Sequence, residues 1–269
     1  INFKMGVEGA AQATVISQYV SGMGITIYAL LKSTHFRIKR KHLKFDINIV
    51  KELANLSILT ALQQSVMNFG ILLVQGLVNS FGTIVMAAFA AAVKIDTLAY
   101  SPVQDFGNAV STFVAQNYGA GKHRRIKDGW KQSMIAASVF CVCVSAVVFI
   151  FAEKFMGLFV SDGTEIIKVG AGYLRIEGSF YIGIGILFLL YGFYRAVGKP
   201  EMSLILTIIS LGTRVVLAYA LSAIPKIGVI GIWISVPIGW FLADMTGLLY
   251  MKKLPLLKSR FRKKYDLHI

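Results

Sequence analysis

Residues 87–125 read AAFAAAVKIDTLAYSPVQDFGNAVSTFVAQNYGAGKHRR. The segment begins as an unbroken apolar helix pattern and ends at a Gly-Ala-Gly break that is followed by basic residues. Lys94, Asp96 and Asp105 lie inside its apolar part, although a charged side chain at the centre of a bilayer costs about 2.5–3.5 kcal/mol even on the lenient insertion scale. Charges at that depth typically mark an ion or substrate pathway, so we expect the rest of the chain to surround this helix.

The composition is that of an integral membrane protein. Of the 269 residues, 56% are hydrophobic and 15% are charged, whereas soluble domains carry about 25% charged residues. The apolar residues gather in blocks close to the ~20 residues that a spanning helix needs, and strand-like alternation is absent. These blocks cover residues 10–31, 56–78, 84–113, 134–151, 172–194, 202–221 and 229–251. The sequence therefore predicts an all-α integral membrane protein with seven transmembrane helices.

The net charge of +15 is explained by membrane topology. Of the 28 Lys and Arg residues, 21 fall in segments 32–51, 122–131, 195–199 and 252–264, and the loops between these segments hold few. The positive-inside rule places the four basic segments and the C-terminus in the cytoplasm. We thus expect a multi-pass protein of the cell membrane, with anionic lipids of the bilayer as the partner of its basic loops and with no nucleic acid.

A weak internal repeat suggests how the helices are grouped. Residues 6–9 (GVEG) open the first apolar block and residues 228–231 (GVIG) open the last, at an offset of 222 residues. A repeat of that length corresponds to six helices, and such repeats recur in transporters. Because the sequence begins in the middle of this pattern, we interpret it as a fragment of a longer protein. The predicted parts are the last helix of an N-terminal lobe (1–31), a basic cytoplasmic interlobe loop (32–53), a six-helix C-terminal lobe (54–253) and a basic cytoplasmic tail (254–269).

Polar side chains inside the apolar blocks predict a hydrated cavity. Lys94 and Asp105 share one helical face about 16 Å apart, and Asp96 lies on the opposite face. Pro102 removes a backbone hydrogen bond between them. An ion-pair network would also explain the charges of residues 94–105, for which we favour the cavity. Hydrogen bonds between helices explain the polar residues of segment 63–75 equally well. The candidate substrate or ion residues are Gln64, Asn68, Gln75, Lys94, Asp96, Gln104, Asp105 and Tyr181.

Other polar groups receive plainer interpretations. Arg214 and Asp244 are expected to form a structural pair or to snorkel toward an interface. The four His residues have no metal-ligand spacing, and the sequence before Lys122 lacks the Gly-x-x-x-x-Gly-Lys spacing of a phosphate loop, because position 116 is Gln. We therefore expect no enzyme activity, no metal site and no cofactor.

Four stretches carry a resemblance to a known family: residues 9–18 (GAAQATVISQ), 94–96 (KID), 108–122 (NAVSTFVAQNYGAGK) and 195–200 (RAVGKP). Together they resemble the multidrug and toxic compound extrusion (MATE) transporters. The resemblance implies two six-helix lobes around a central cavity, of which this chain is the sixth helix plus the C-terminal lobe, without most of the N-terminal lobe. It also implies export of cationic or lipophilic xenobiotics by alternating access, in exchange for H⁺ or Na⁺.

The chain departs from one sodium-coupled branch of the family that it resembles. Members of that branch have acidic residues in the seventh and tenth helices. The matching positions here hold Met67, Asn68 and residues 183–185 (GIG), so Asp96 and Asp105 are the deep acids that the best candidate helix offers. A lipid-linked oligosaccharide flippase of the same superfamily ranks second, because it would need a strongly basic cavity. A membrane-embedded transferase ranks lower, and the fragment alone can be inactive.

Overall fold

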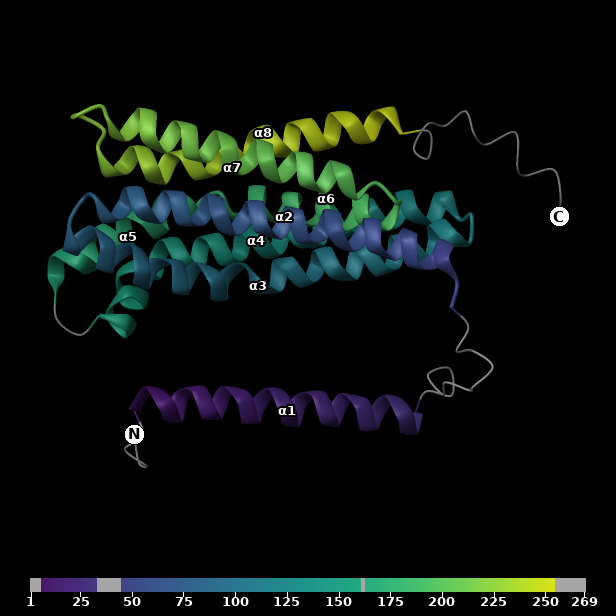
Figure 1. Ribbon diagram of the computed structural model, residues 1–269. Coiled ribbons are helices and arrows are strands. Elements are labelled where there is room, and N and C mark those ends of the chain that lie inside the picture. Colours follow the sequence, from purple (N-terminus) through teal and green to yellow (C-terminus); the bar gives the residue numbers. More distant parts are fainter. Residues whose placement is uncertain (1–5, 33–44, 161–162, 255–269) are drawn as a thin grey trace. The chain divides into compact units, whose positions relative to one another are not determined.

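A computed structural model describes residues 6–32, 45–160 and 163–254 of the chain, and within these ranges the regular structure is α-helical. The helices are α1 (Gly6–Lys32), α2 (Ile47–Asn79), α3 (Thr83–Gly119), α4 (His123–Phe159), α5 (Thr164–Gly178), α6 (Tyr181–Ala196), α7 (Pro200–Ser222) and α8 (Val229–Lys253) (Figure 1). Six of them are long and apolar enough to cross a membrane, and α5 and α6 together form a seventh, broken span. The predicted all-α fold with seven spans is confirmed.

The chain divides into two units, residues 1–53 and 54–269. In the first unit, α1 is a single long helix whose apolar side chains are exposed, among them Ile16 and Tyr19. Of the predicted interlobe loop, residues 33–44 lie outside the described ranges, as does the predicted tail from residue 255. The second unit, which we call the lobe, holds almost all of α2 and the whole of α3–α8.

Helix α6 lies at the centre of the lobe, packed against α3, α4, α7 and α8. Its glycines permit backbone contact: a Cβ atom at Gly192 would lie 2.1 Å from the Gly107 carbonyl oxygen of α3, and one at Gly185 would lie 2.6 Å from Cys141 Sγ of α4. Small residues of this kind let transmembrane helices approach closely where dispersion forces, rather than water exclusion, drive packing.

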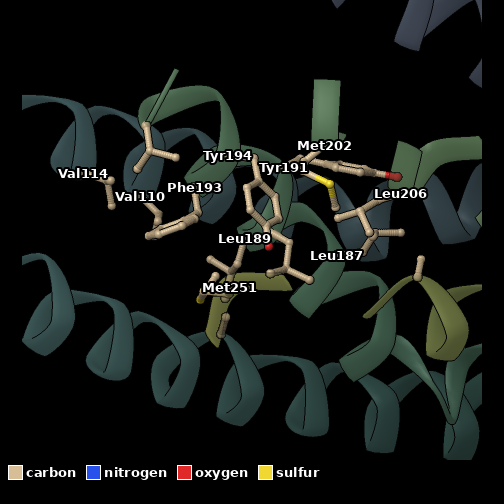
Figure 2. Packing of buried hydrophobic residues seen from close by; sticks show 14 of the residues in the cluster. Val110, Val114, Leu187, Leu189, Tyr191, Phe193, Tyr194, Met202, Leu206 and Met251 are labelled. Carbon is tan, nitrogen blue, oxygen red and sulfur yellow. The ribbon is translucent and has the colours of Figure 1, made fainter. Parts of the chain in front are cut away.

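Buried apolar side chains fill the space around α6. Figure 2 shows Phe193 of α6 beside Val110 and Val114 of α3, with Leu187 and Leu189 of α6 in the same cluster. A second cluster joins Phe89 of α3, Tyr173 of α5 and Trp233 of α8, whose rings lie within 5.4 Å of one another. These two clusters hold α3, α5, α6 and α8 in fixed positions, which is what a polar site inside the lobe requires.

The fifth predicted block, residues 172–194, is not one straight helix. It divides into α5 and α6, which are bent by 53° at Ser179 and Phe180. Gly178 and Ser179 form a Gly/Ser pair, which is a recognised cause of sharp kinks, and the Ser179 hydroxyl donates to the Arg175 carbonyl oxygen at 2.6 Å. The break brings Glu177 and Tyr181 to the two sides of one bend.

Candidate functional site

Two buried carboxyl groups lie beside the α5–α6 break. Asp96 of α3 is 1% exposed and Glu177 of α5 is 4% exposed. The Tyr181 hydroxyl donates a short hydrogen bond to Asp96 Oδ1, and the buried Tyr173 packs in the same core cluster as Tyr181. The two acids are close enough to repel each other when both are ionised. We call these two acids and two tyrosines the acid cluster.

The acid cluster has unused capacity to bind an ion. Asp96 Oδ2 and Glu177 Oε2 are buried and have no hydrogen-bond partner among the described residues. The guanidinium group of Arg214, on α7, acts electrostatically on both carboxyls, but its Nε is itself buried without a described partner. One cation facing two carboxylates leaves one negative charge, which a bound proton or cation would neutralise, and buried charges require such compensation.

A second feature is a polar stripe along the exposed face of α3. Its members recur every three or four residues, the spacing of one helical face, and all of them are exposed in the structure. They are Lys94, Thr97, Ser101, Gln104, Asp105, Asn108 and Thr112. Lys94 and Asp105 lie within about 11 Å of the helix midpoint at 1.5 Å per residue, so both are at a depth that corresponds to hydrocarbon.

The stripe is available to a ligand. Its hydroxyl groups donate to carbonyl oxygens of their own helix, as from Ser101 to Thr97 at 2.6 Å. The charged and amide side chains of Lys94, Gln104 and Asp105 make no hydrogen bond or ion pair within the described part of the chain. Charged groups at membrane depth are found facing a bundle interior or a water-filled cavity rather than lipid, and this stripe has the character of a cavity wall.

The eight candidate residues therefore fall in three places. Asp96 and Tyr181 meet in the acid cluster, while Lys94, Gln104 and Asp105 lie on the polar stripe. The other three, Gln64, Asn68 and Gln75, lie on α2, where Gln75 Nε2 donates to Asn79 Oδ1 at 2.9 Å. Tyr181 is buried, and its hydroxyl makes the polar contact to Asp96.

Two groups differ from the sequence interpretation. The ion pairs in the described ranges are Arg124–Asp128 and Arg175–Glu153, so Arg214 and Asp244 do not form the expected pair, and the 6% exposure of Asp244 also excludes snorkelling. Glu177 was not among the candidates, because its place near the start of an apolar block suggested a membrane surface. The signal that could have found it is the Gly178-Ser179 pair, since broken transmembrane helices form ion sites.

Comparison with known sequences gives a consistent result. The sequence model of the MatE family matches residues 58–220 of this chain. A probable multidrug resistance protein NorM from Thermotoga maritima is 26% identical over 97% of this chain and 55% of its own length. A probable multidrug resistance protein YpnP from Bacillus subtilis is 28% identical over 93% and 55%, and the multidrug export protein MepA of Staphylococcus aureus is 26% identical over 77% and 46%. The chain spans about half the length of these relatives.

Solved structures share the fold. The outward-facing conformation of a multidrug resistance MATE family transporter matches with a TM-score of 0.85 and 24% identity, over 94% of this chain and 57% of the other. A MOP superfamily transporter from Pyrococcus furiosus matches with a TM-score of 0.87 and 24% identity, over 96% and 59%. Both cover nearly all of this chain and little more than half of the compared one, as expected for a chain that matches one lobe and a neighbouring helix.

Proposed function

Because the chain belongs to the MatE family, whose relatives named above are multidrug resistance and export proteins, we propose that it forms the sixth helix and the C-terminal lobe of a multidrug exporter. The transporter would exchange cationic or lipophilic xenobiotics for H⁺ or Na⁺ by alternating access. The observation that carries this proposal is the polar stripe on α3, because an exposed row of charges at membrane depth needs a hydrated cavity beside it.

The composition of the polar stripe is suited to the proposed cationic substrates. It presents one acid and one base among amides and hydroxyls, so it can offer Asp105 to a cationic compound without a strong field of either sign. A flippase that carries a pyrophosphate group would instead need several cations on this wall, and the stripe offers only Lys94 among the described residues. Export of cations is therefore the better match, and the fragment needs its N-terminal lobe to close the cavity.

The acid cluster is proposed as the place where the driving ion binds. Discontinuous helices form coupling-ion sites near the bilayer midplane in many transporters, and two buried, incompletely bonded carboxyls lie beside the α5–α6 break. An ion that neutralises this cluster would favour one lobe arrangement over another, which is how a ligand shifts a conformational equilibrium. The basic segments set the orientation: the α3–α4, α6–α7 and C-terminal connections are placed in the cytoplasm by the positive-inside rule.

The proposal is tested by ethidium efflux from cells that express the full-length parent. The Na⁺ gradient and the pH gradient are collapsed separately, and membrane abundance is measured in parallel. Loss of efflux with one gradient alone identifies the coupling ion. No efflux under any gradient, with the protein present in the membrane, would contradict the drug-export proposal and favour the flippase.

Asp105→Asn in the full-length parent is expected to lower resistance to ethidium about fivefold while membrane abundance stays unchanged. The reason is the loss of one unpartnered carboxylate from the proposed cavity wall, since a single hydrogen bond contributes about 1 kcal/mol. The measurement is the minimum inhibitory concentration with immunoblotting. Asp128→Asn is the matched control, because Asp128 is an exposed acid near the start of α4 that pairs with Arg124 at 3.8 Å. Equal resistance in both variants would remove Asp105 from the cavity.

A further inference from the structure

Helix α7 carries a line of polar residues through the interior of the lobe. Ser203, Thr207 and Ser210 are at most 5% exposed, and Arg214 continues the same face, since positions i, i+4, i+7 and i+11 align along a helix. From Ser203 to Arg214 the line is about 16 Å long at 1.5 Å per residue. Lipid-facing positions on the same helix are apolar, as at Ile208 and Val216, so the polar residues face inward.

Hydrogen bonds connect this line to α6. Thr207 Oγ1 donates to the Tyr191 hydroxyl oxygen at 3.0 Å and also approaches the Ser203 carbonyl oxygen at 3.0 Å. Ser203 Oγ donates to the Tyr191 carbonyl oxygen at 3.3 Å. Figure 2 shows Tyr191 beside Met202 and Leu206 of α7. The hydroxyls thus lie in an otherwise apolar interface between α6 and α7.

A lone acid joins the line from α8. Asp244 is 6% exposed, and its Oδ1 is buried without a hydrogen-bond partner among the described residues. It lies within electrostatic range of Tyr191, and its Oδ2 would be 3.8 Å from a Cβ atom at Gly183, in the first turn of α6. The charged residues on the helices packed against α8 are Glu201 and Arg214 of α7, Glu165, Lys168, Arg175 and Glu177 of α5, and Arg195 at the end of α6.

Both ends of the polar line are defined. Ser203 lies in the first turn of α7, directly after the loop at residues 197–199, which the proposed topology places in the cytoplasm. At the other end, Asp244 lies beside Gly183 in the first turn of α6, the turn in which the Tyr181 hydroxyl donates to Asp96. Thr207 and Asp244 lie roughly 10–14 Å from the ends of their helices on the cytoplasmic side. The two residues are therefore at similar depth, and Asp244 adds a proton-binding group beside the polar line.

We propose that Ser203, Thr207, Ser210, Tyr191 and Asp244 form a proton pathway inside the lobe, separate from the drug cavity, that connects the cytoplasm to the acid cluster. Asp244 binds a proton and releases it. Each hydroxyl accepts a proton on its oxygen as it passes its own to the next group or bridging water, so none keeps a net charge. Arg214 is the fixed counter-charge at the inner end and carries no proton.

The chemistry of the line selects a proton rather than Na⁺. Hydroxyls one turn apart have Cβ atoms about 5–6 Å from one another, a gap that one water molecule can bridge. A metal ion would need several oxygen atoms around it at every step, and a single row of hydroxyl groups does not supply them. This inference rests on the proposed function, in which the acid cluster binds the driving ion. Of the two ions named there, H⁺ and Na⁺, the pathway would deliver H⁺ to the cluster.

The test uses the purified full-length transporter in liposomes that contain a pH-sensitive dye. The variants are Asp244→Asn and Thr207→Val, and the measurements are ethidium-coupled proton flux and ethidium affinity without a gradient. Thr246→Val is the matched control, because Thr246 also bonds to its own helix, at 2.8 Å to the Leu242 carbonyl oxygen, but is only partly buried and lies outside the polar line. Asp244→Glu tests whether a carboxyl, rather than the local packing, is required.

The expected result is a loss of proton flux of about tenfold in Asp244→Asn and about fivefold in Thr207→Val. Ethidium affinity stays within about twofold, Thr246→Val behaves as wild type, Asp244→Glu recovers part of the flux, and the solvent deuterium isotope effect on the flux rises in Thr207→Val.

Wild-type flux in both Asp244→Asn and Thr207→Val, with Asp96→Asn inactive, would overturn the pathway and leave the proposed function standing. Transport driven by Na⁺ alone would also overturn the pathway. If Asp244→Asn does not accumulate, Thr207→Val decides.

Discussion

Asp96→Asn in the full-length parent is expected to reduce gradient-driven ethidium efflux at least tenfold. A loss of this size is typical when one proton-transfer group is removed from a site. Asparagine keeps the shape of the side chain and can still accept the hydrogen bond from Tyr181. It cannot bind a proton or carry a compensating negative charge. The protein should fold, because Asp96 takes part in neither of the described ion pairs and asparagine occupies the same space.

The measurement is efflux under an imposed gradient, with membrane abundance and thermal stability determined on the same variants. Tyr181→Phe is the graded companion: it removes only the hydroxyl that contacts Asp96 and should give a smaller loss. Asp105→Asn separates the two regions, because it should change the range of exported compounds more than the dependence on the gradient. Efflux at the wild-type rate in Asp96→Asn would show that the acid cluster does not couple transport to an ion.

Gly192→Val is expected to lower the melting temperature of the full-length protein by roughly 5–10 °C and to reduce its abundance in the membrane. A Cβ atom at this position would lie 2.1 Å from the Gly107 carbonyl oxygen and 3.4 Å from the Ser111 nitrogen. These are backbone atoms that cannot rotate away, so α3 and α6 would have to separate. The change would disturb the core that positions Asp96.

Gly212→Val is the matched control, because Gly212 is also inside a helix, is exposed, and has nothing within 4 Å of an added Cβ atom. It should leave the melting temperature unchanged or raise it slightly, since valine has a better helix propensity than glycine. Thermal unfolding in detergent, followed by the fluorescence of a thiol-reactive dye on the buried Cys141, measures both variants. Equal melting temperatures would mean that the α3–α6 contact is not tight in the folded protein.

The sequence alone predicted the membrane-spanning helices and the faces of α3 on which its charged residues lie. Apolar blocks of about 20 residues leave little choice of secondary structure, and all seven blocks fall on helices. The helical period also predicted that Asp96 and Asp105 lie on opposite faces, and the structure places Asp96 in the lobe interior and Asp105 on the exposed stripe. Periodicity within one helix is local information, which is why it could be predicted.

Contacts between helices could not be predicted in the same way. The hydrogen bond from Tyr181 to Asp96 joins residues 85 positions apart, and no spacing rule connects them. Glu177 looked like a residue of the membrane surface until the α5–α6 bend placed it in the interior. Arg214 and Asp244 seemed natural partners by charge, yet Asp244 faces Gly183 of α6 and Arg214 acts on the acid cluster. Rotation of each helix about its axis, which packing determines, was the missing quantity.

The polar stripe on α3 also has a consequence for biosynthesis. When the helices of this lobe leave the translocon, a stripe that holds Lys94 and Asp105 meets lipid unless a covering surface is already in place, at a cost of about 2.5–3.5 kcal/mol for each central charge. In the proposed full-length transporter, the N-terminal lobe would be synthesised first and would receive the stripe directly. The order of the two lobes along the chain would then act as a folding aid, and a lobe released without its counterpart would be a substrate for membrane quality-control proteases.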